Sequence, residues 1–322
     1  MTPRSRPALT AASLGLGLAL ALTACSGPGA SLDAAAPGDD ARTVTISGTN
    51  GDVTVPVEPE RVVALDSTSF ETLRDWGVTP VAAPKGLLPR EGFEDWLADD
   101  DIADVGTHRE PDLEAVAAAE PDVIIGGYRF AEYTDELERI APVVDVAGSD
   151  EHEGGYVASL EHQAEQLGLL FGREQDAAEL VAGFERSERA AADATDGESV
   201  FLAVVSGGMI DNGAQRLGRI IEPLDLVDVF AGDEGDVHGD SGLAPETIAQ
   251  ADPDWAIVMD RDAAIGEGDS PAAAVFAAQE AFASTTFGRE GHVLHLDPTF
   301  YTRESLQSYQ EAYDQITEAF TA

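Results

Sequence analysis

Short apolar runs alternate with helical segments along most of this chain, and this alternation is the feature that most limits its possible folds. Strands that alternate with helices favour α/β layers with a largely parallel sheet. Six apolar runs are predicted as buried strands: 62–65, 123–125, 143–146, 200–205, 255–259 and 292–296.

The middle of the chain predicts helices with no strand between them. Residues 156–171 and 174–194 form two such segments, and the second is about 30 Å long at about 1.5 Å per residue. We therefore predict an α/β fold with two Rossmann-like lobes, each with a central β-sheet, joined by one long rigid α-helix, with a ligand cleft between the lobes. The expected ranges are 43–173 for the N-terminal lobe, 174–195 for the interlobe helix and 196–322 for the C-terminal lobe.

Two smaller features complete the predicted fold. Residues 43–47 and 53–55 flank Asn50-Gly51, a dipeptide typical of a tight hairpin turn. Helices are predicted over 67–76 and from about residue 304 to residue 320.

The N-terminus has the pattern of a targeting segment. Two arginines precede an apolar run that is short for a membrane span, and the run ends in Leu22-Thr-Ala-Cys25, which resembles a bacterial lipobox. The resemblance implies that residues 1–24 are a lipoprotein signal peptide. It also implies a lipidated Cys25 that anchors the protein at the extracytoplasmic face of the cell membrane. Residues 25–42, rich in Gly, Pro, Ala and Asp, predict a flexible tether.

Acidic residues greatly outnumber basic ones. The chain has 61 Asp and Glu against 18 Lys and Arg, which gives a formal net charge of −43. Such a surface repels the phosphates of nucleic acids, so we expect no nucleic-acid partner. The acidity itself is explained most simply by solubility, and against this background the few arginines become informative.

An internal repeat places one arginine in each half of the chain. The copies begin at Pro111 and Pro245, and each has a short helix, an acidic-Pro-Asp stop and an apolar strand. Arg129 and Arg261 each lie eight residues after the second proline of their copy. Ligands of open α/β sheets bind beyond the carboxyl ends of the strands. A lone arginine there would be taken as a solvated loop charge, whereas the matched pair predicts an anion site.

Five motifs occur in an order that is typical of one family. They are Val105-Gly-Thr before Pro111-Asp-Leu-Glu114, Gly213-Ala-Gln-Arg-Leu-Gly, Asp236-Val-His-Gly239, Met259-Asp-Arg261, and Leu296-Asp-Pro followed by Tyr301. The chain resembles class III periplasmic-type binding proteins, especially the branch that binds ferric catecholate siderophores. This resemblance implies a solute-binding protein of an ABC importer that delivers an anionic ferric siderophore, catecholate-type favoured, to a membrane permease. It implies no cofactor of the protein's own, only ferric iron bound within the siderophore.

The resemblance also implies that three arginines surround the ligand: Arg129, Arg216 and Arg261. Their number matches the three negative charges of a ferric tris-catecholate. Attraction between unit charges about 5 Å apart is about 3 kcal/mol at an effective dielectric constant of about 20. Guanidinium groups can also lie against catecholate rings.

Iron coordination and pocket lining are further implications of the resemblance. His238 and Tyr301 match the residues that complete iron coordination when the siderophore leaves two sites open, and His238 has an ordinary loop histidine as its alternative. The sequence departs from the family over 299–304, so the side chain of this loop that reaches the ligand stays open. Tyr128 is expected to line the pocket, and Phe300 is an alternative to Tyr301 in that role.

Glu114 and Glu246 occupy equal positions in the two repeat copies, each seven residues before the second proline. In related importers one surface glutamate per lobe meets arginines of the permease, so the resemblance implies this docking role. The alternative is that both are ordinary surface acids. A monomer is expected.

Other functional classes are less well supported. An enzyme is not expected, because the chain has neither a G-x-S-x-G elbow nor a glycine-rich phosphate loop after a strand. A bare zinc or manganese site needs clustered ligands, and the six histidines are scattered. Haem, hydroxamate siderophores and cobalamin remain alternative ligands of the same fold. A haem binder would also use His238 and Tyr301, but the three arginines favour a more highly charged ligand.

Overall fold

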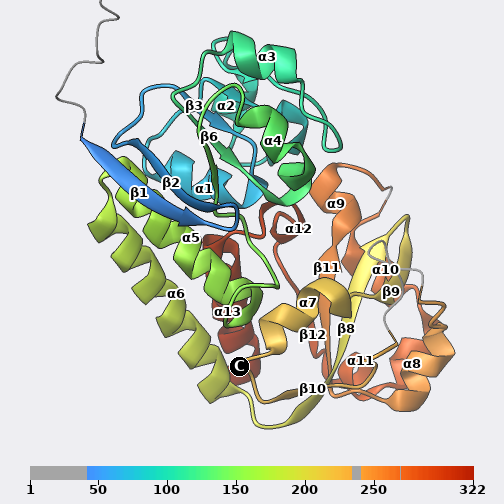
Figure 1. Cartoon of the computed structure of the whole chain (residues 1–322). Coiled ribbons are helices and arrows are strands. Elements are labelled where there is room, and N and C mark those ends of the chain that lie inside the picture. Colours follow the sequence, from blue (N-terminus) through green and yellow to red (C-terminus); the bar gives the residue numbers. More distant parts are fainter. Residues whose placement is uncertain (1–41, 234–240, 269) are drawn as a thin grey trace, which may run out of the picture. The chain divides into compact units, whose positions relative to one another are not determined.

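The N-terminal lobe is built on a five-stranded sheet in which every neighbouring pair is parallel, in the order β5-β4-β3-β6-β7. The computed structural model (Figure 1) describes residues 42–233, 241–268 and 270–322. The strands are β3 (Val62–Ala64), β4 (Ala82–Ala83), β5 (Ala103–Asp104), β6 (Val123–Gly126) and β7 (Val143–Asp145).

The C-terminal lobe has a second five-stranded sheet. Its parallel path is β10-β8-β11-β12, and β9 pairs antiparallel with β8. The strands are β8 (Glu198–Ser206), β9 (Met209–Asn212), β10 (Leu226–Asp228), β11 (Trp255–Asp260) and β12 (Val293–His295). The predicted α/β fold with a sheet in each lobe is therefore confirmed, although β4, β5, β9 and β10 were not among the predicted strands.

Both sheets reverse their strand order at an equivalent point. In the N-terminal lobe the chain leaves β3 toward β4 and returns to its other side at β6. In the C-terminal lobe β8 is flanked in the same way by β10 and β11. Ligands of doubly wound sheets bind at such switch points, beyond the carboxyl ends of the strands. The strands that precede Arg129 and Arg261 are β6 and β11, so both arginines follow a strand at a switch point.

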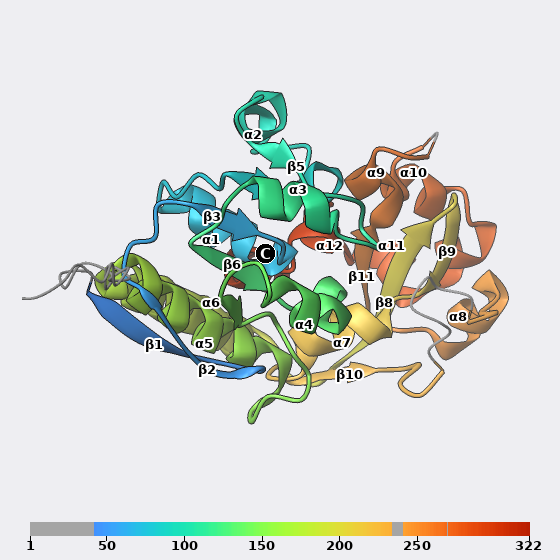
Figure 2. The same ribbon diagram turned by 45° about the horizontal axis from the view of Figure 1, so that its top comes forward.

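Three long helices pack together beside the sheets: α5 (Gly155–Phe171), α6 (Glu174–Ala194) and α13 (Leu306–Thr321). Figures 1 and 2 both show α5 and α6 side by side. Helix α5 packs into a hydrophobic cluster of each lobe, because Leu160 belongs to one cluster of the C-terminal lobe and Leu167 to one of the N-terminal lobe. The single long helix predicted to join the lobes is present as α6.

The predicted hairpin and the predicted C-terminal helix are both present. Strands β1 (Thr43–Gly48) and β2 (Gly51–Pro56) form the antiparallel hairpin, in which Gly51 adopts φ +101°. The C-terminal helix begins two residues later than predicted, because Glu304 is left-handed and the Ser305 side chain accepts a hydrogen bond from the Ser308 amide.

Short helices connect the remaining elements. The 3-10 helices are η1 (Ser67–Ser69), η2 (Lys85–Leu87), η3 (Tyr128–Tyr133) and η4 (Glu280–Ser284). The α-helices are α1 (Phe70–Asp75), α2 (Glu94–Ala98), α3 (Leu113–Ala118), α4 (Thr134–Leu137), α7 (Ala214–Ile221), α8 (Pro245–Ala251), α9 (Arg261–Ile265), α10 (Ala272–Ala277), α11 (Thr286–Glu290) and α12 (Phe300–Arg303). Within the described ranges, none of the helices has the length and apolar character needed to span a bilayer.

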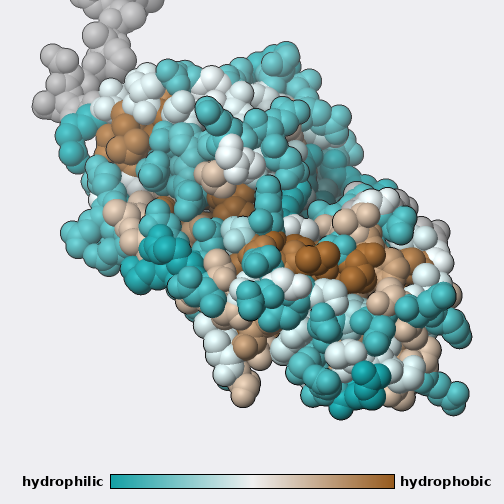
Figure 3. Space-filling model, turned by 90° about the horizontal axis from the view of Figure 1, so that it is seen from below, coloured by the Kyte–Doolittle hydropathy of each residue, from teal (hydrophilic) through white to brown (hydrophobic). Residues whose placement is uncertain are grey.

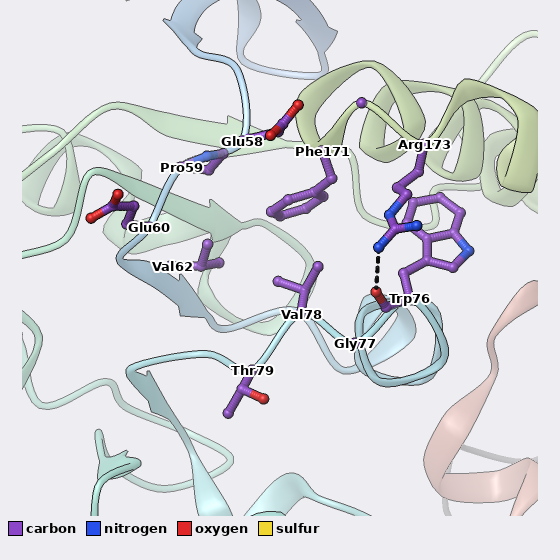
Figure 4. Close-up of a pocket in the computed structure, with 11 residues that line it drawn as sticks. Glu58, Pro59, Glu60, Val62, Trp76, Gly77, Val78, Thr79, Phe171 and Arg173 are labelled. Carbon is purple, nitrogen blue, oxygen red and sulfur yellow. Dashed lines mark hydrogen bonds between the residues drawn. The ribbon is translucent and has the colours of Figure 1, made fainter.

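One face of the molecule carries an apolar band (Figure 3), and the described part of the chain has several hollows. Figure 3 shows a mainly hydrophilic face that a hydrophobic band interrupts. One hollow of about 420 Å³ in the N-terminal lobe is lined by Val62, Trp76 and Arg173, and the Arg173 guanidinium donates to the Trp76 carbonyl oxygen at 3.3 Å (Figure 4). Because Val62 begins β3, this hollow lies at the amino ends of the strands, away from the edge where Arg129 lies.

Candidate ligand-binding site

Arg129 follows β6 on a turn that only a glycine allows. Gly127 has φ +100°, and a Cβ atom there would lie 2.0 Å from a carboxylate oxygen of Asp145. The chain then enters η3, where the Arg129 Cζ lies 5.4 Å from the centroid of the Tyr128 ring. Arg129 is exposed and forms no ion pair with any residue that the structure describes. Its charge is therefore free to act on a ligand.

Two of the predicted arginines lie close to the Tyr301 ring. The Cζ atom of Arg216 is 4.6 Å from the ring centroid, and that of Arg261 is 5.7 Å away. Arg261 also donates from Nε to the Tyr301 hydroxyl at 3.2 Å. The structure thus brings together three predicted site residues that come from α7, α9 and α12.

Arg261 begins α9 directly after β11. Its Nη1 lies 3.4 Å from the hydroxyl of Ser206 at the end of β8, and 3.8 Å from the carboxylate of Asp262. The Asp262 carboxylate in turn accepts the amides of Gly207 and Gly208, both at 2.8 Å. These contacts tie Arg261 to the carboxyl ends of two neighbouring strands, as its position in the repeat predicted.

A fourth arginine, which the sequence analysis did not identify, completes the group. Arg219 lies one turn after Arg216 on α7, and residues with this spacing share a helix face. Its guanidinium lies 2.5 Å from an Asp150 carboxylate oxygen and its Cζ lies 3.9 Å from the Tyr156 ring centroid. We call Arg216, Arg219 and Arg261 the arginine cluster. The i, i+3 spacing was the available signal for Arg219.

Glu304 is the second residue that the sequence analysis missed. It ends α12 in the left-handed conformation, with φ +44°, and is only 4% exposed. One carboxylate oxygen lies 2.5 Å from Arg216 Nη1, and the other lies 3.7 Å from Arg219 Nη1. Burial lowers the pKa of the Arg216 guanidinium, but the Glu304 carboxylate opposes this strongly enough that the net pKa is raised. Arg216 and Glu304 therefore form a buried ion pair.

Tyr128 connects the N-terminal lobe to this group. Burial raises the pKa of its phenol, and the charge of Glu304 raises it further. The guanidinium groups of Arg216 and Arg129 act in the opposite direction on the same pKa. Tyr128 thus lies within electrostatic reach of charges from both lobes, and its side chain is 37% exposed.

The loop that carries Tyr301 and Glu304 is anchored to the N-terminal lobe. The buried Glu71 of α1 accepts hydrogen bonds from Arg303 Nη1 at 2.6 Å and from the Ser305 hydroxyl at 2.5 Å. Arg303 also donates to Glu311 of α13 at 2.7 Å. The position of the loop is therefore fixed from two sides.

The other predicted residues have varied locations. Phe300 is 2% exposed and its ring lies 5.1 Å from that of Tyr309, so it is a core residue and the alternative that it lines the pocket was wrong. Glu114 and Glu246 are both exposed, each at the second position of a short helix, α3 and α8. Cys25 and His238 lie outside the described residues. In the described part of the chain, no three or more His, Cys, Asp or Glu side chains gather as a metal site would require.

Comparisons with known proteins agree with this architecture. The petrobactin-binding protein YclQ of Bacillus subtilis (strain 168) is 30% identical over 249 residues, which cover 76% of each chain. Its crystal structure matches with a TM-score of 0.75 at 26% identity, covering 87% of this chain and 99% of that one. The ferric-anguibactin-binding protein FatB of Vibrio anguillarum (strain ATCC 68554 / 775) is 25% identical over 285 residues, 86% of this chain and 87% of FatB.

A second solved structure supports the fold alone. The periplasmic catecholate-siderophore binding protein VctP from Vibrio cholerae matches with a TM-score of 0.75 at 23% identity, covering 86% of this chain and all of that one (100%). Residues 62–299, which include both sheets and most of the site, match the family described as periplasmic binding protein. The chain therefore belongs to the periplasmic binding protein family.

Proposed function

We propose that this protein is the solute-binding component of an ABC importer, which captures an anionic ferric siderophore and delivers it to the membrane permease. The observation that carries the proposal is the arrangement of Arg216 and Arg261 around Tyr301, beyond the carboxyl ends of the strands. The similarity to relatives named for petrobactin and ferric anguibactin supports the choice of a siderophore.

The chemistry of the site suits a ferric chelate with catecholate groups. Guanidinium groups donate planar pairs of hydrogen bonds to oxygen anions and lie flat against aromatic rings. Arg261 already donates to a phenolic oxygen, that of Tyr301, and a catecholate offers oxygens of the same kind. The formal charge of the whole chain is −43, so an anion is attracted only where arginines gather.

Iron contacts and membrane attachment form part of the same proposal. Tyr301, together with His238, would complete the coordination of iron in a siderophore that leaves two positions open. Cys25 would carry the lipid that holds a monomeric protein at the extracytoplasmic membrane surface. The ferric iron is cargo within the siderophore, and the protein would need no cofactor of its own.

Glu114 and Glu246 are the residues proposed to dock on the permease. Both lie in the first turn of an exposed helix, one in each lobe. The Asp112 carboxylate accepts the amide of Glu114 at 3.1 Å, which fixes the start of α3, and a hollow of about 480 Å³ beside Glu114 is bordered by Tyr133. A carboxylate on a fixed helix start suits an arginine partner.

The proposed function is tested by titrating the purified protein with ferric catecholates, ferric hydroxamates, haem and cobalamin, and following the quenching of intrinsic fluorescence. We expect submicromolar binding of a ferric catecholate-type siderophore and at least tenfold weaker binding of the other three. Tighter binding of haem or of a hydroxamate would reject the ligand class. Binding of free ferric or zinc ions without a chelator would reject a siderophore as the cargo.

A further inference from the structure

We infer that Glu304 sets the charge of the ligand site, so that the protein prefers ferric chelates of low net negative charge over a fully charged tris-catecholate. The inference rests on the proposed function, because it specifies which ferric siderophores the site accepts. It differs from the expectation drawn from sequence, in which three free arginines match three ligand charges.

The arginine cluster is already largely neutralised by the protein. Glu304 lies 2.5 Å from Arg216, Asp150 lies 2.5 Å from Arg219, and Asp262 lies 3.8 Å from Arg261. Arg129 alone among the four site arginines lacks a carboxylate partner in the part of the chain that the structure describes. The site as a whole therefore offers about one net positive charge, which matches a chelate with a single negative charge.

Glu304 is held in place more firmly than Asp150, the exposed carboxylate of the group. Its side chain is 5% exposed, whereas that of Asp150 is 64% exposed. The next residue, Ser305, donates to the buried Glu71, and the preceding Arg303 binds the same carboxylate. Solvent therefore screens the charge of Asp150, whereas the buried charge of Glu304 acts on the site with little screening.

The surroundings of Glu304 make its charge effective. Charges that are removed from water are screened less than charges at the surface. Burial raises the pKa of Tyr128, Tyr156 and Tyr309, which lie on three different elements, and the charge of the Glu304 carboxylate raises each pKa further. Its field therefore extends over the cluster and cancels part of the attraction of the arginines for an anion. Because the cost of removing a chelate from water rises more steeply with its charge than this reduced attraction does, a ligand with one negative charge is favoured over a ligand with three.

The test uses two synthetic ferric chelates and the intact protein. One is a hexadentate tris-catecholate with three net negative charges, and the other is a tetradentate bis-catecholate with one. We expect the wild type to bind the singly charged chelate more tightly. We expect Glu304→Gln to raise the affinity for the triply charged chelate at least tenfold, and to change the affinity for the singly charged one severalfold less.

A matched control removes a distant charge of the same kind. Glu185→Gln on α6 removes an exposed ion-pair partner of Arg189. The affinities of this variant for the two chelates should equal those of the wild type. If Glu304→Gln shifts both affinities equally, or if the wild type prefers the triply charged chelate, the inference is overturned while the proposed function stands. If the wild type binds neither chelate, the proposed function itself fails.

A second variant keeps the test decisive when Glu304→Gln does not fold, as thermal unfolding followed by circular dichroism would reveal. Asp150→Asn removes the exposed counter-charge of Arg219. We expect it to shift the preference in the same direction by about twofold to threefold, because this charge is better screened by solvent. A preference that moves the other way, or not at all, would contradict the charge-setting role.

Discussion

The two lobes contribute to the proposed site in different ways. The N-terminal lobe offers Arg129, which is exposed and forms no ion pair with a described residue, whereas the C-terminal lobe offers Arg216, which is buried against Glu304. An unpaired surface arginine contributes to ligand affinity and little to stability, whereas a buried ion pair affects both ligand affinity and stability. We therefore propose that the N-terminal side of the site provides charge for the ligand and that the C-terminal side provides a preformed surface.

The lobes also treat their buried carboxylates differently. Asp66, after β3 in the N-terminal lobe, is 1% exposed and is held by neutral donors from Thr68 and Gln163. Glu304 in the C-terminal lobe is paired with arginine instead. Burial raises the pKa of Asp66 from 3.8 to about 6, because hydrogen bonds from neutral groups only partly replace water. A carboxylate held without a counter-charge thus becomes sensitive to pH.

The largest expected effect is on the paired side of the site. Arg216→Gln would leave the Glu304 carboxylate buried without its main partner, and breaking such a pair costs about 3–5 kcal/mol. The free energy of unfolding in urea should fall by about that amount. The double variant Arg216→Gln/Glu304→Gln should recover most of the loss, because no lone charge stays buried. Equal stability of the two variants would contradict the pairing.

The second largest expected effect concerns Asp66, the buried carboxylate that accepts hydrogen bonds from neutral groups only. The pKa of Asp66 is higher in the folded state than in the unfolded state, so the folded protein binds the extra proton between about pH 4 and pH 6. The free energy of unfolding therefore falls as the pH rises through that window. The whole decrease is about 3 kcal/mol, at about 1.4 kcal/mol per pKa unit.

Urea unfolding of the wild type and of Asp66→Asn at several pH values measures this effect. The stability of the variant relative to the wild type should improve from pH 4 to pH 6 and then stay constant, because asparagine does not titrate. A difference that does not vary with pH would show that folding does not raise the pKa of Asp66. The Asp66→Asn variant also loses one acceptor for Gln163 and Thr68, but this loss does not depend on pH, so the pH dependence of the difference reports on Asp66 alone.

The contrast between the lobes also explains what could be predicted from the sequence. Arg261 was placed correctly because a buried strand and its carboxyl end leave a local pattern. Glu304 was missed because its role comes from Arg216, which is 88 residues away in the chain. The bond from Arg303 to Glu71 spans 232 residues, and no local pattern reports such a pair. Strand β9 was missed because Met209–Asn212 includes polar residues and is stabilised as a strand by its pairing with β8.

The smallest effect belongs to the unpaired side of the site. Arg129→Gln should weaken binding of an anionic ferric chelate by about tenfold, which is about 1.4 kcal/mol. The melting temperature should not change measurably, because surface substitutions of this kind usually stay within about 0.5 kcal/mol. Fluorescence quenching and thermal unfolding of the same samples give both quantities.

Arg139→Gln is the matched control for this prediction. Like Arg129, Arg139 is exposed, lies in the N-terminal lobe and forms no ion pair with a described residue. Its substitution removes the same charge, but Arg139 follows α4 and not a strand of the sheet. If both variants weaken binding equally, the effect comes from the total charge of the lobe and Arg129 has no special position. If only Arg129→Gln weakens binding, and does so without loss of stability, then Arg129, positioned by the turn at Gly127, contributes its charge to ligand binding and not to the stability of the fold.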